Sequence, residues 1–211
     1  QKIPIYGLFE SYFISYGRFK QLETTDEKKT APKKTYIVAS SRRTGSTMLC
    51  DFLQRTGVLG YPNEYIRNVL SVLAQEDMIN PGYALEEALK VNQTPNGAFG
   101  MKIHWSALEQ FSEAVFPNLN NEEKNLFENL LHDSEYIYLS RRNKIRQAIS
   151  DWRARGTGIF HIRKNSKNSI QRRHGRKLPY DYARLKRHIV DFVKGDEGWK
   201  TFFKTNNIHP L

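Results

Sequence analysis

The sequence predicts an α/β fold with a central, mainly parallel sheet. Three short runs rich in β-branched and aromatic residues, at residues 35–39, 98–105 and 135–140, are typical of buried strands. Each run is followed by a segment whose apolar residues recur at helical spacing. Because strands that alternate with helices along one chain pair in parallel, these two observations together indicate an α/β domain.

Each predicted helix has recognisable ends in the sequence. Glycine or proline marks most of the breaks, because glycine accommodates the left-handed turn after a helix and proline cannot continue one. The first helix, which carries Cys50 on its expected core side, should stop at Gly57. Pro62, Asn63 and Glu64 fit the first turn of the next helix. The remaining helices are expected at residues 66–94 with a break at 80–82, at 106–131 with an interruption near Pro117, at about 143–154 and at 182–203.

The composition is that of a folded, strongly basic protein. The chain has 211 residues, enough for one α/β domain, and we divide it into an N-terminal arm and linker, residues 1–34, and a domain, residues 35–211. An apolar fraction of 39% excludes a disordered chain, and the net charge of +11 implies an anionic partner. The single cysteine excludes an internal disulfide, and six scattered histidines lead us to expect no metal.

Two targeting signals are missing from the sequence. There is no apolar run of about 18 residues, the length that a membrane-spanning helix requires. No secretory signal pattern is visible either. We therefore expect no transmembrane segment and a cytoplasmic location.

The segment between the first strand and the first helix has the pattern of an anion-binding loop. In a strand–loop–helix unit with a glycine in the loop, the loop amides and the helix N-terminus can hold a phosphate-like group. Hydroxyls and arginines add further donors, and arginine presents a planar fork to an oxyanion. The plainer alternative is a helix N-terminus rich in Ser and Thr caps, which accounts for only one or two of the hydroxyls. The loop residues concerned are Ser41, Arg42, Arg43, Thr44, Gly45, Ser46 and Thr47.

This loop predicts a P-loop-like fold without the lysine of a nucleotide hydrolase. A loop of the GxxxxGK[ST] kind needs lysine after its second glycine, whereas Ser46 follows Gly45 here. The cations are instead Arg42 and Arg43. The predicted fold class is therefore a P-loop-like, three-layer α/β/α arrangement around the mainly parallel sheet.

The third predicted strand delivers a second basic group to the same edge of the sheet. It ends at Arg141 and Arg142, and Ser150 lies on the helix that follows. Since ligands of open α/β sheets bind at the carboxyl ends of the strands, these residues are candidates for a second anion contact. The alternative is a solvated basic helix. Residues 161–177 show no apolar periodicity and are strongly basic, which indicates a long loop that closes over a polyanion or lies in solvent.

Four blocks of the sequence together resemble the bacterial trehalose 2-sulfotransferase family. They are TYIVASSRRTGSTMLCDFLQRTGVLGYPNEYI, TPNGAFGMKIHW, YIYLSRRNKIRQAISDWRARGTG and EGWKTFFKTNNIHP. They follow one another in the family's order over residues 35–211, which makes the combination specific although each block alone is weak. The resemblance implies a sulfotransferase that uses 3′-phosphoadenosine 5′-phosphosulfate (PAPS). It also implies that the family's C-terminal segment would extend beyond Leu211.

The resemblance implies which residues bind the cofactor PAPS. The loop Ser41–Thr47 would hold the 5′-phosphosulfate group, with Arg43 and Ser46 as its main contacts. No metal ion is implied. The 3′-phosphate contacts would be Arg141, Arg142 and Ser150.

For catalysis, the resemblance leaves two candidate bases. Glu64 matches the family's proposed general base, and Lys102 and Trp105 match its G-x-K-x-x-W block near the substrate. His104 departs from the trehalose enzymes and instead matches a Lys-x-His block that carries the base in the wider cytosolic sulfotransferases. The base is therefore either Glu64 or His104.

The predicted function is transfer of a sulfuryl group from PAPS to an acceptor hydroxyl of a carbohydrate or glycolipid. Arg43 would stabilise the leaving phosphate, while Glu64 or His104 takes the acceptor's proton. Two alternatives stay open: a P-loop phosphotransferase that needs ATP and Mg²⁺, and a basic non-enzymatic module that binds a polyanion. The expected partners are a hydroxyl-bearing small molecule or glycan, with a homodimer as the assembly to be tested. No nucleic acid is expected, because no recognised nucleic-acid motif is present.

Overall fold

The computed structural model describes residues 31–73, 81–160 and 178–211 of the chain. The arm expected at residues 1–34 lies almost entirely outside this part, as does the basic loop expected at residues 161–177.

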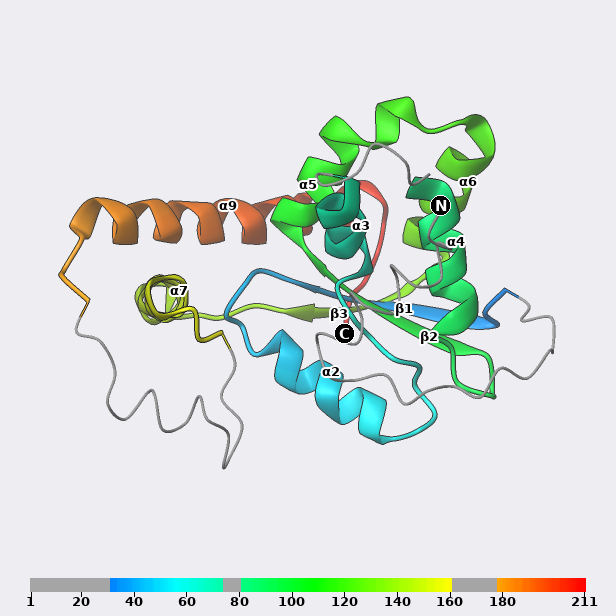
Figure 1. Ribbon diagram of the computed structural model, residues 1–211, viewed down its shortest axis with the longest axis horizontal. Helices are drawn as coiled ribbons and strands as arrows, with labels where there is room; N and C mark the ends of the chain where they lie inside the picture. The colour runs from blue at the N-terminus through cyan, green and yellow to red at the C-terminus, as the bar shows by residue number, and fades with distance from the viewer. Residues whose placement is uncertain (1–30, 74–80, 161–177) are drawn as a thin grey trace, which may run out of the picture. The chain divides into compact units, whose positions relative to one another are not determined.

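A three-stranded sheet forms the centre of the fold (Figure 1). Strand β1 (Lys34–Ser40) lies between β2 (Ala98–His104) and β3 (Glu135–Leu139). Both neighbours run parallel to β1. The α/β class and the parallel sheet predicted from the sequence are therefore confirmed.

The register of the sheet brings polar residues of β1 and β2 together at one edge. Ser40, at the end of β1, is level with His104 at the end of β2, and Val38 is level with Lys102. Strand β2 is buried along its whole length. Because the strands are parallel, their carboxyl ends meet at the same edge, which is where open α/β sheets bind ligands.

Helices flank this sheet on two sides. Their bounds are α2 (Ser46–Arg55), α3 (Tyr65–Leu73), α4 (Pro81–Val91), α5 (Trp105–Ala114), the 3₁₀ turn η1 (Phe116–Asn118), α6 (Asn121–Asp133), α7 (Lys144–Thr157) and α9 (Tyr182–Thr205). Helix α2 lies on one side of the strands, and α5 and α9 lie on the other (Figure 1). The predicted helices agree with these to within a few residues at the ends that the structure describes, and the interruption expected near Pro117 is η1. The end expected near residue 80 for the helix that starts at 66 lies outside the described residues.

The apolar residues of helix α2 are not all on its buried face. Cys50 is buried, as expected from the sequence. Met48 and Phe52 follow the same helical spacing but are 63% and 60% exposed. The helix packs against the sheet through one stripe, so apolar side chains outside that stripe stay in contact with solvent.

The last helix, α9, is attached to the end of β1 through an aromatic cluster. Trp199 is completely buried and stacks on Phe203, with Trp105 against its edge. Its indole nitrogen donates a hydrogen bond of 3.1 Å to the backbone oxygen of Ser40. A side chain at Gly198 would collide with the ring of Trp105, so α9 can approach α5 this closely only with glycine there. This packing fixes the position at which the chain leaves β1.

Beyond α9 the chain runs beside β3. Leu211 donates a backbone hydrogen bond to Tyr136 and accepts one from Tyr138, both 2.9 Å long. This is the pattern of parallel strand pairing. No helix within the described ranges is long and apolar enough to span a membrane.

Candidate active site

The loop between β1 and α2 makes a tight turn at the carboxyl edge of the sheet. Gly45, the residue that caps α2, has φ of 99°, and Arg43 has φ of 66°. Both values lie in the left-handed region, which glycine adopts freely and other residues adopt at a cost. Since the cap residue is glycine, it has no side chain that could accept a hydrogen bond from the first-turn N–H groups of α2, which begin at Ser46. This arrangement suits an anion at the helix N-terminus.

Two of the loop hydroxyls form hydrogen bonds to other groups of the protein. The hydroxyl of Ser41 is buried and donates to the carboxylate of Asp196 on α9, at 3.2 Å. The hydroxyl of Thr44 donates to the backbone oxygen of Ser41 at 3.0 Å. Lys144, at the start of α7, pairs with the same Asp196 and compensates its charge. In this state, these two loop hydroxyls therefore stabilise the turn.

Arg42 is tied to the interior behind the loop. Its guanidinium lies 3.7 Å from the carboxylate of Asp151, a completely buried residue of α7, and donates to Ser106 at 3.3 Å. The ring of Phe192 on α9 lies 5.8 Å from it. The amide of Gln147, also completely buried, donates to the backbone oxygen of Arg42 at 2.6 Å. These contacts attach the loop to α7 and α9.

Arg43, the next residue, turns toward different partners. Its Nε donates to the hydroxyl of Ser150 on α7 at 3.0 Å, and its NH1 donates to the backbone oxygen of Phe160 at 2.7 Å. Arg141 donates to the backbone oxygen of Arg43 at 3.2 Å. The structure thus brings together residues from three segments that the sequence assigned to two phosphate contacts. We call Arg43, Arg141 and Ser150 the Arg43 group; Arg142 is exposed next to Arg141.

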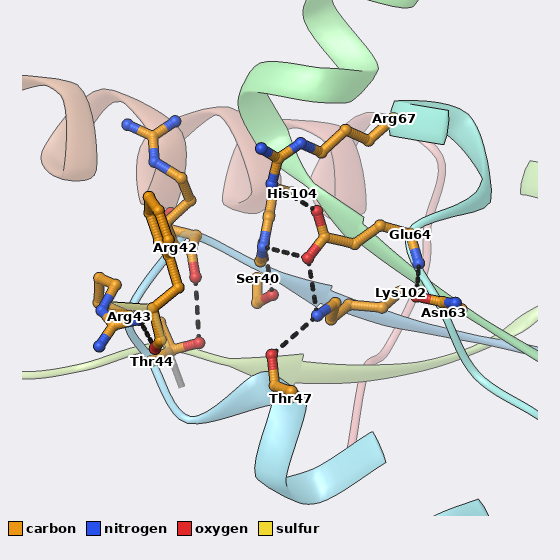
Figure 2. Close-up of polar contacts among 12 residues, drawn as sticks. Ser40, Arg42, Arg43, Thr44, Thr47, Asn63, Glu64, Arg67, Lys102 and His104 are labelled. Atoms are coloured by element: carbon orange, nitrogen blue, oxygen red, sulfur yellow. Dashed lines mark hydrogen bonds and ion pairs between the residues drawn. The ribbon is translucent and has the colours of Figure 1, made fainter. Parts of the chain in front are cut away.

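A second group of charged residues surrounds Glu64 (Figure 2). Its Oε1 lies 2.8 Å from Lys102 Nζ and 3.4 Å from His104 Nε2, and its Oε2 lies 3.0 Å from Arg67 NH1. Lys102 Nζ also donates to the hydroxyl of Thr47, in the first turn of α2, at 3.0 Å. We call Glu64, Arg67, Lys102 and His104 the Glu64 cluster. Through Lys102 it is joined to the helix that carries the anion loop.

Backbone pairing explains why Glu64 meets Lys102. Asn63 forms an isolated parallel bridge with Met101, and its oxygen accepts a hydrogen bond of 2.9 Å from Lys102 N. In a parallel bridge the next residues of the two segments are also neighbours, and here these are Glu64 and Lys102. Pro62–Glu64 was predicted to be the first turn of a helix; this detail is wrong, because α3 begins at Tyr65 and Asn63 extends the sheet edge.

The charges of the cluster keep the Glu64 carboxylate ionised. Burial alone would raise the pKa of Glu64, but the hydrogen bond from His104 and the charge of Lys102 outweigh it and hold the pKa far below its usual range. The side chain of Glu64 is 19% exposed, against 5% for Lys102 and 8% for His104. Glu64 is therefore the member of the three that an approaching molecule can reach most easily.

Both ring nitrogens of His104 face other protein groups. Nε2 faces Glu64, and Nδ1 lies 3.1 Å from the hydroxyl of Ser40. Trp105, predicted to lie near the substrate, is only partly buried and packs against Trp199. Of the two residues predicted as bases, the geometry leaves Glu64 the more accessible one.

Several residues of this site were missed by reasoning from the sequence. Arg67 was detectable in principle, because it follows Glu64 by three residues on a helix that begins at Tyr65. Asp151, Asp196 and Gln147 carried no such signal, since they reach the loop from helices far away in sequence. Within the described ranges there is no group of three or more His, Cys, Asp or Glu that could hold a metal ion.

Comparison with known proteins gives a consistent result. Residues 35–211 match the model of the family described as Stf0 sulphotransferase. A trehalose 2-sulfotransferase of Mycobacterium tuberculosis (strain ATCC 35801 / TMC 107 / Erdman) is 24% identical over 84% of this chain and 76% of its own length. The trehalose 2-sulfotransferase of Mycolicibacterium smegmatis (strain ATCC 700084 / mc(2)155) is 22% identical over 83% of this chain and 75% of its own. A family match that spans the sheet, the anion loop and the Glu64 cluster means that the chain belongs to the Stf0 sulphotransferase family and is a sulfotransferase.

Proposed function

We propose that this sulfotransferase moves a sulfuryl group from PAPS to a hydroxyl of a carbohydrate or glycolipid acceptor. One observation carries the proposal: Lys102 contacts both Glu64 and Thr47, so a candidate base lies next to the N-terminus that would hold the donor. The acceptor class is inferred from the two relatives, both named trehalose 2-sulfotransferase. The fold belonging to this function is a P-loop-like, three-layer α/β/α domain at residues 35–211, supported by α2 and α9 on opposite sides of the sheet (Figure 1).

The Arg43 group and the start of α2 would bind the donor. Arg43, Ser46 and the first-turn amides of α2 are suited to the 5′-phosphosulfate, because arginine and helix N-termini both favour oxyanions. Arg141, Arg142 and Ser150 are suited to the 3′-phosphate. Support comes from the 3.0 Å contact between Arg43 and Ser150, since a donor with two phosphates needs both contact sets close together.

Glu64 would act as the base at the other side of the site. The acceptor oxygen forms a bond to sulfur, the bond between sulfur and the bridging oxygen breaks, and that electron pair stays on the 5′-phosphate. The acceptor's proton passes to Glu64. Positive charge from Arg43, Lys102 and the helix amides stabilises the departing phosphate. We favour Glu64 over His104 because both ring nitrogens of His104 already face protein groups.

The two other functions considered from the sequence fit less well. A P-loop phosphotransferase would use lysine after Gly45, where the chain has Ser46. A non-enzymatic polyanion-binding module gives no role to a carboxylate surrounded by Lys102, His104 and Arg67. Membership of a sulfotransferase family agrees with neither.

A labelled-transfer assay tests the proposal. The full chain is incubated with ³⁵S-labelled PAPS and separate acceptors: trehalose, other mono- and disaccharides, a glycolipid and a simple phenol. We expect label on at least one carbohydrate-containing acceptor, and none when Glu64→Gln replaces the wild type. Transfer from labelled ATP and Mg²⁺ in place of PAPS, or exclusive labelling of the phenol, would contradict the proposal.

A further inference from the structure

Lys102 lies between the candidate base, Glu64, and the start of α2, where the donor would bind. Its ammonium group lies 2.8 Å from Glu64 Oε1 and 3.0 Å from Thr47 Oγ1, and its side chain is almost completely buried (Figure 2). The ammonium group therefore has two partners. One is the carboxylate of the candidate base, Glu64, and the other is the hydroxyl of Thr47 in the first turn of α2.

The three partners of Glu64, namely Arg67, His104 and Lys102, are not equivalent. Arg67 reaches Oε2 from the exposed side of α3, and its own side chain is 59% exposed, so solvent screens this pair. His104 is fixed by Ser40 through its second ring nitrogen. Lys102 alone among the three also contacts the helix that would hold the donor, as far as the described residues go.

The low pKa of Glu64 raises a chemical difficulty for its proposed role. A carboxylate held this strongly by hydrogen bonds and charge is a weak proton acceptor, and general bases work best when their pKa lies closer to the working pH. An anion bound at the start of α2 would lie next to Thr47, within reach of the Lys102 ammonium. Moving that ammonium away from Glu64 would remove the contribution of one of the two residues, His104 and Lys102, that lower its pKa. An opposite charge at this range is worth roughly one to three in pKa.

We propose that Lys102 couples donor binding to activation of the base: it pairs with Glu64 in the free protein and turns to the donor anion when that anion binds beside Thr47. This inference rests on the proposed function and adds an order of events to it. Glu64 is protected by Lys102 until the donor is in place, and only then takes the acceptor's proton. For the proton transfer Lys102 acts as a positioning residue, because this effect runs through Glu64; its charge on the departing phosphate is the separate role proposed above.

A titration of Glu64 tests the coupling directly. The Glu64 carboxyl is followed by NMR with ¹³C-labelled glutamate, assigned from the signal that Glu64→Gln removes, with and without 3′-phosphoadenosine 5′-phosphate. This desulfated nucleotide is stable to acid and keeps the 5′-phosphate that would meet Lys102. We expect saturating nucleotide to raise the pKa of Glu64 by about one or more in the wild type. An unchanged pKa under saturation would overturn the inference.

Variants separate the coupling from a purely structural role. In Lys102→Met the pKa of Glu64 should be raised already in the free protein, and the nucleotide should shift it little further. Lys102→Arg keeps the charge and should restore part of the nucleotide response. Lys90→Met is the matched control, because Lys90 also pairs with two carboxylates, Glu86 and Glu87, but on the surface of α4. It should leave the Glu64 titration as in the wild type.

The outcome is distinguishable from failure of the proposed function. Calorimetry reports whether the nucleotide binds at all, and the ³⁵S assay reports whether transfer occurs. Transfer without any change in the Glu64 titration would refute the coupling and leave the sulfotransferase proposal standing. Absence of nucleotide binding would refute both.

Discussion

The Arg43 group and the Glu64 cluster lie in one site but are built in different ways. The Arg43 group draws on the loop after β1 and the segment after β3, two places where a serine and then two arginines follow a strand. The Glu64 cluster is assembled by an isolated backbone bridge between Asn63 and Met101. Local sequence patterns were enough to name the residues of the first group, whereas no local pattern indicated the bridge that assembles the second. Under the proposed function their roles differ: anion binding for the Arg43 group and proton transfer for the Glu64 cluster.

Neighbouring arginines show the same contrast on a smaller scale. Arg42 is attached to the buried Asp151, while Arg43 faces Ser150. If this division is correct, removing the partner of Arg42 should affect stability, and removing Arg43 should affect donor binding.

The largest effect on stability is expected for Asp151→Asn. This change leaves two guanidinium groups, of Arg42 at 3.7 Å and of Arg155 at 3.0 Å, next to a buried neutral group, and breaking a buried ion pair from one side costs about 3–5 kcal/mol. The free energy of unfolding, measured with urea, checks this. Asp133→Asn is the control, because Asp133 pairs with His132 on the surface and should change stability little. Equal small losses in the two variants would show that the ion pairs of Asp151, the one with Arg42 included, do not anchor the fold.

The next effect is expected for Arg43→Ala. Hydrogen bonds to charged groups are worth about 1.5–3 kcal/mol, so affinity for 3′-phosphoadenosine 5′-phosphate should fall by roughly 10- to 150-fold. Calorimetry measures the affinity, and Arg153→Ala, an exposed arginine on α7, serves as control. If Arg153→Ala weakened binding as much as Arg43→Ala, the donor would be held by general positive charge and not by the Arg43 group.

A smaller effect concerns stability in acid. Since the pKa of Glu64 in the folded protein lies below its value in the unfolded chain, its ionised form stabilises the fold above about pH 4.3, and this contribution is lost as the pH falls through the folded pKa. The difference in unfolding free energy between the wild type and Glu64→Gln should therefore shrink between pH 5 and pH 3. A difference that stays constant over this range would mean that the cluster does not lower the pKa of Glu64.

Much of the fold could be predicted from the sequence, for physical reasons that the residues show. The strands were detectable because each combines β-branched and aromatic residues between turn signals, and the anion loop because two arginines stand two and three residues before Gly45, directly after a strand. The different directions of Arg42 and Arg43 were not detectable. They depend on the left-handed backbone of Arg43 and on Asp151, which reaches the loop from a distant helix.

The Glu64 cluster was predicted only as a set of unconnected residues. Glu64, Lys102 and His104 were each named, but the resemblance made Glu64 and His104 alternatives. The structure joins them in one hydrogen-bonded group in which His104 lies between Ser40 and Glu64. Spacing along the chain could not reveal this, because the bridge that aligns Glu64 with Lys102 connects segments that are far apart in sequence.

Single-turnover transfer by Glu64→Gln and His104→Asn tests most directly the claim that Glu64 is the base. The rate of ³⁵S transfer from PAPS to the best acceptor of the panel is compared with the wild type, with nucleotide affinity measured in parallel. We expect Glu64→Gln to lose about 10²- to 10⁴-fold in rate with unchanged affinity, and His104→Asn to lose less than about tenfold. The reverse order, or equal mild losses in both variants, would contradict the assignment of Glu64 as the base.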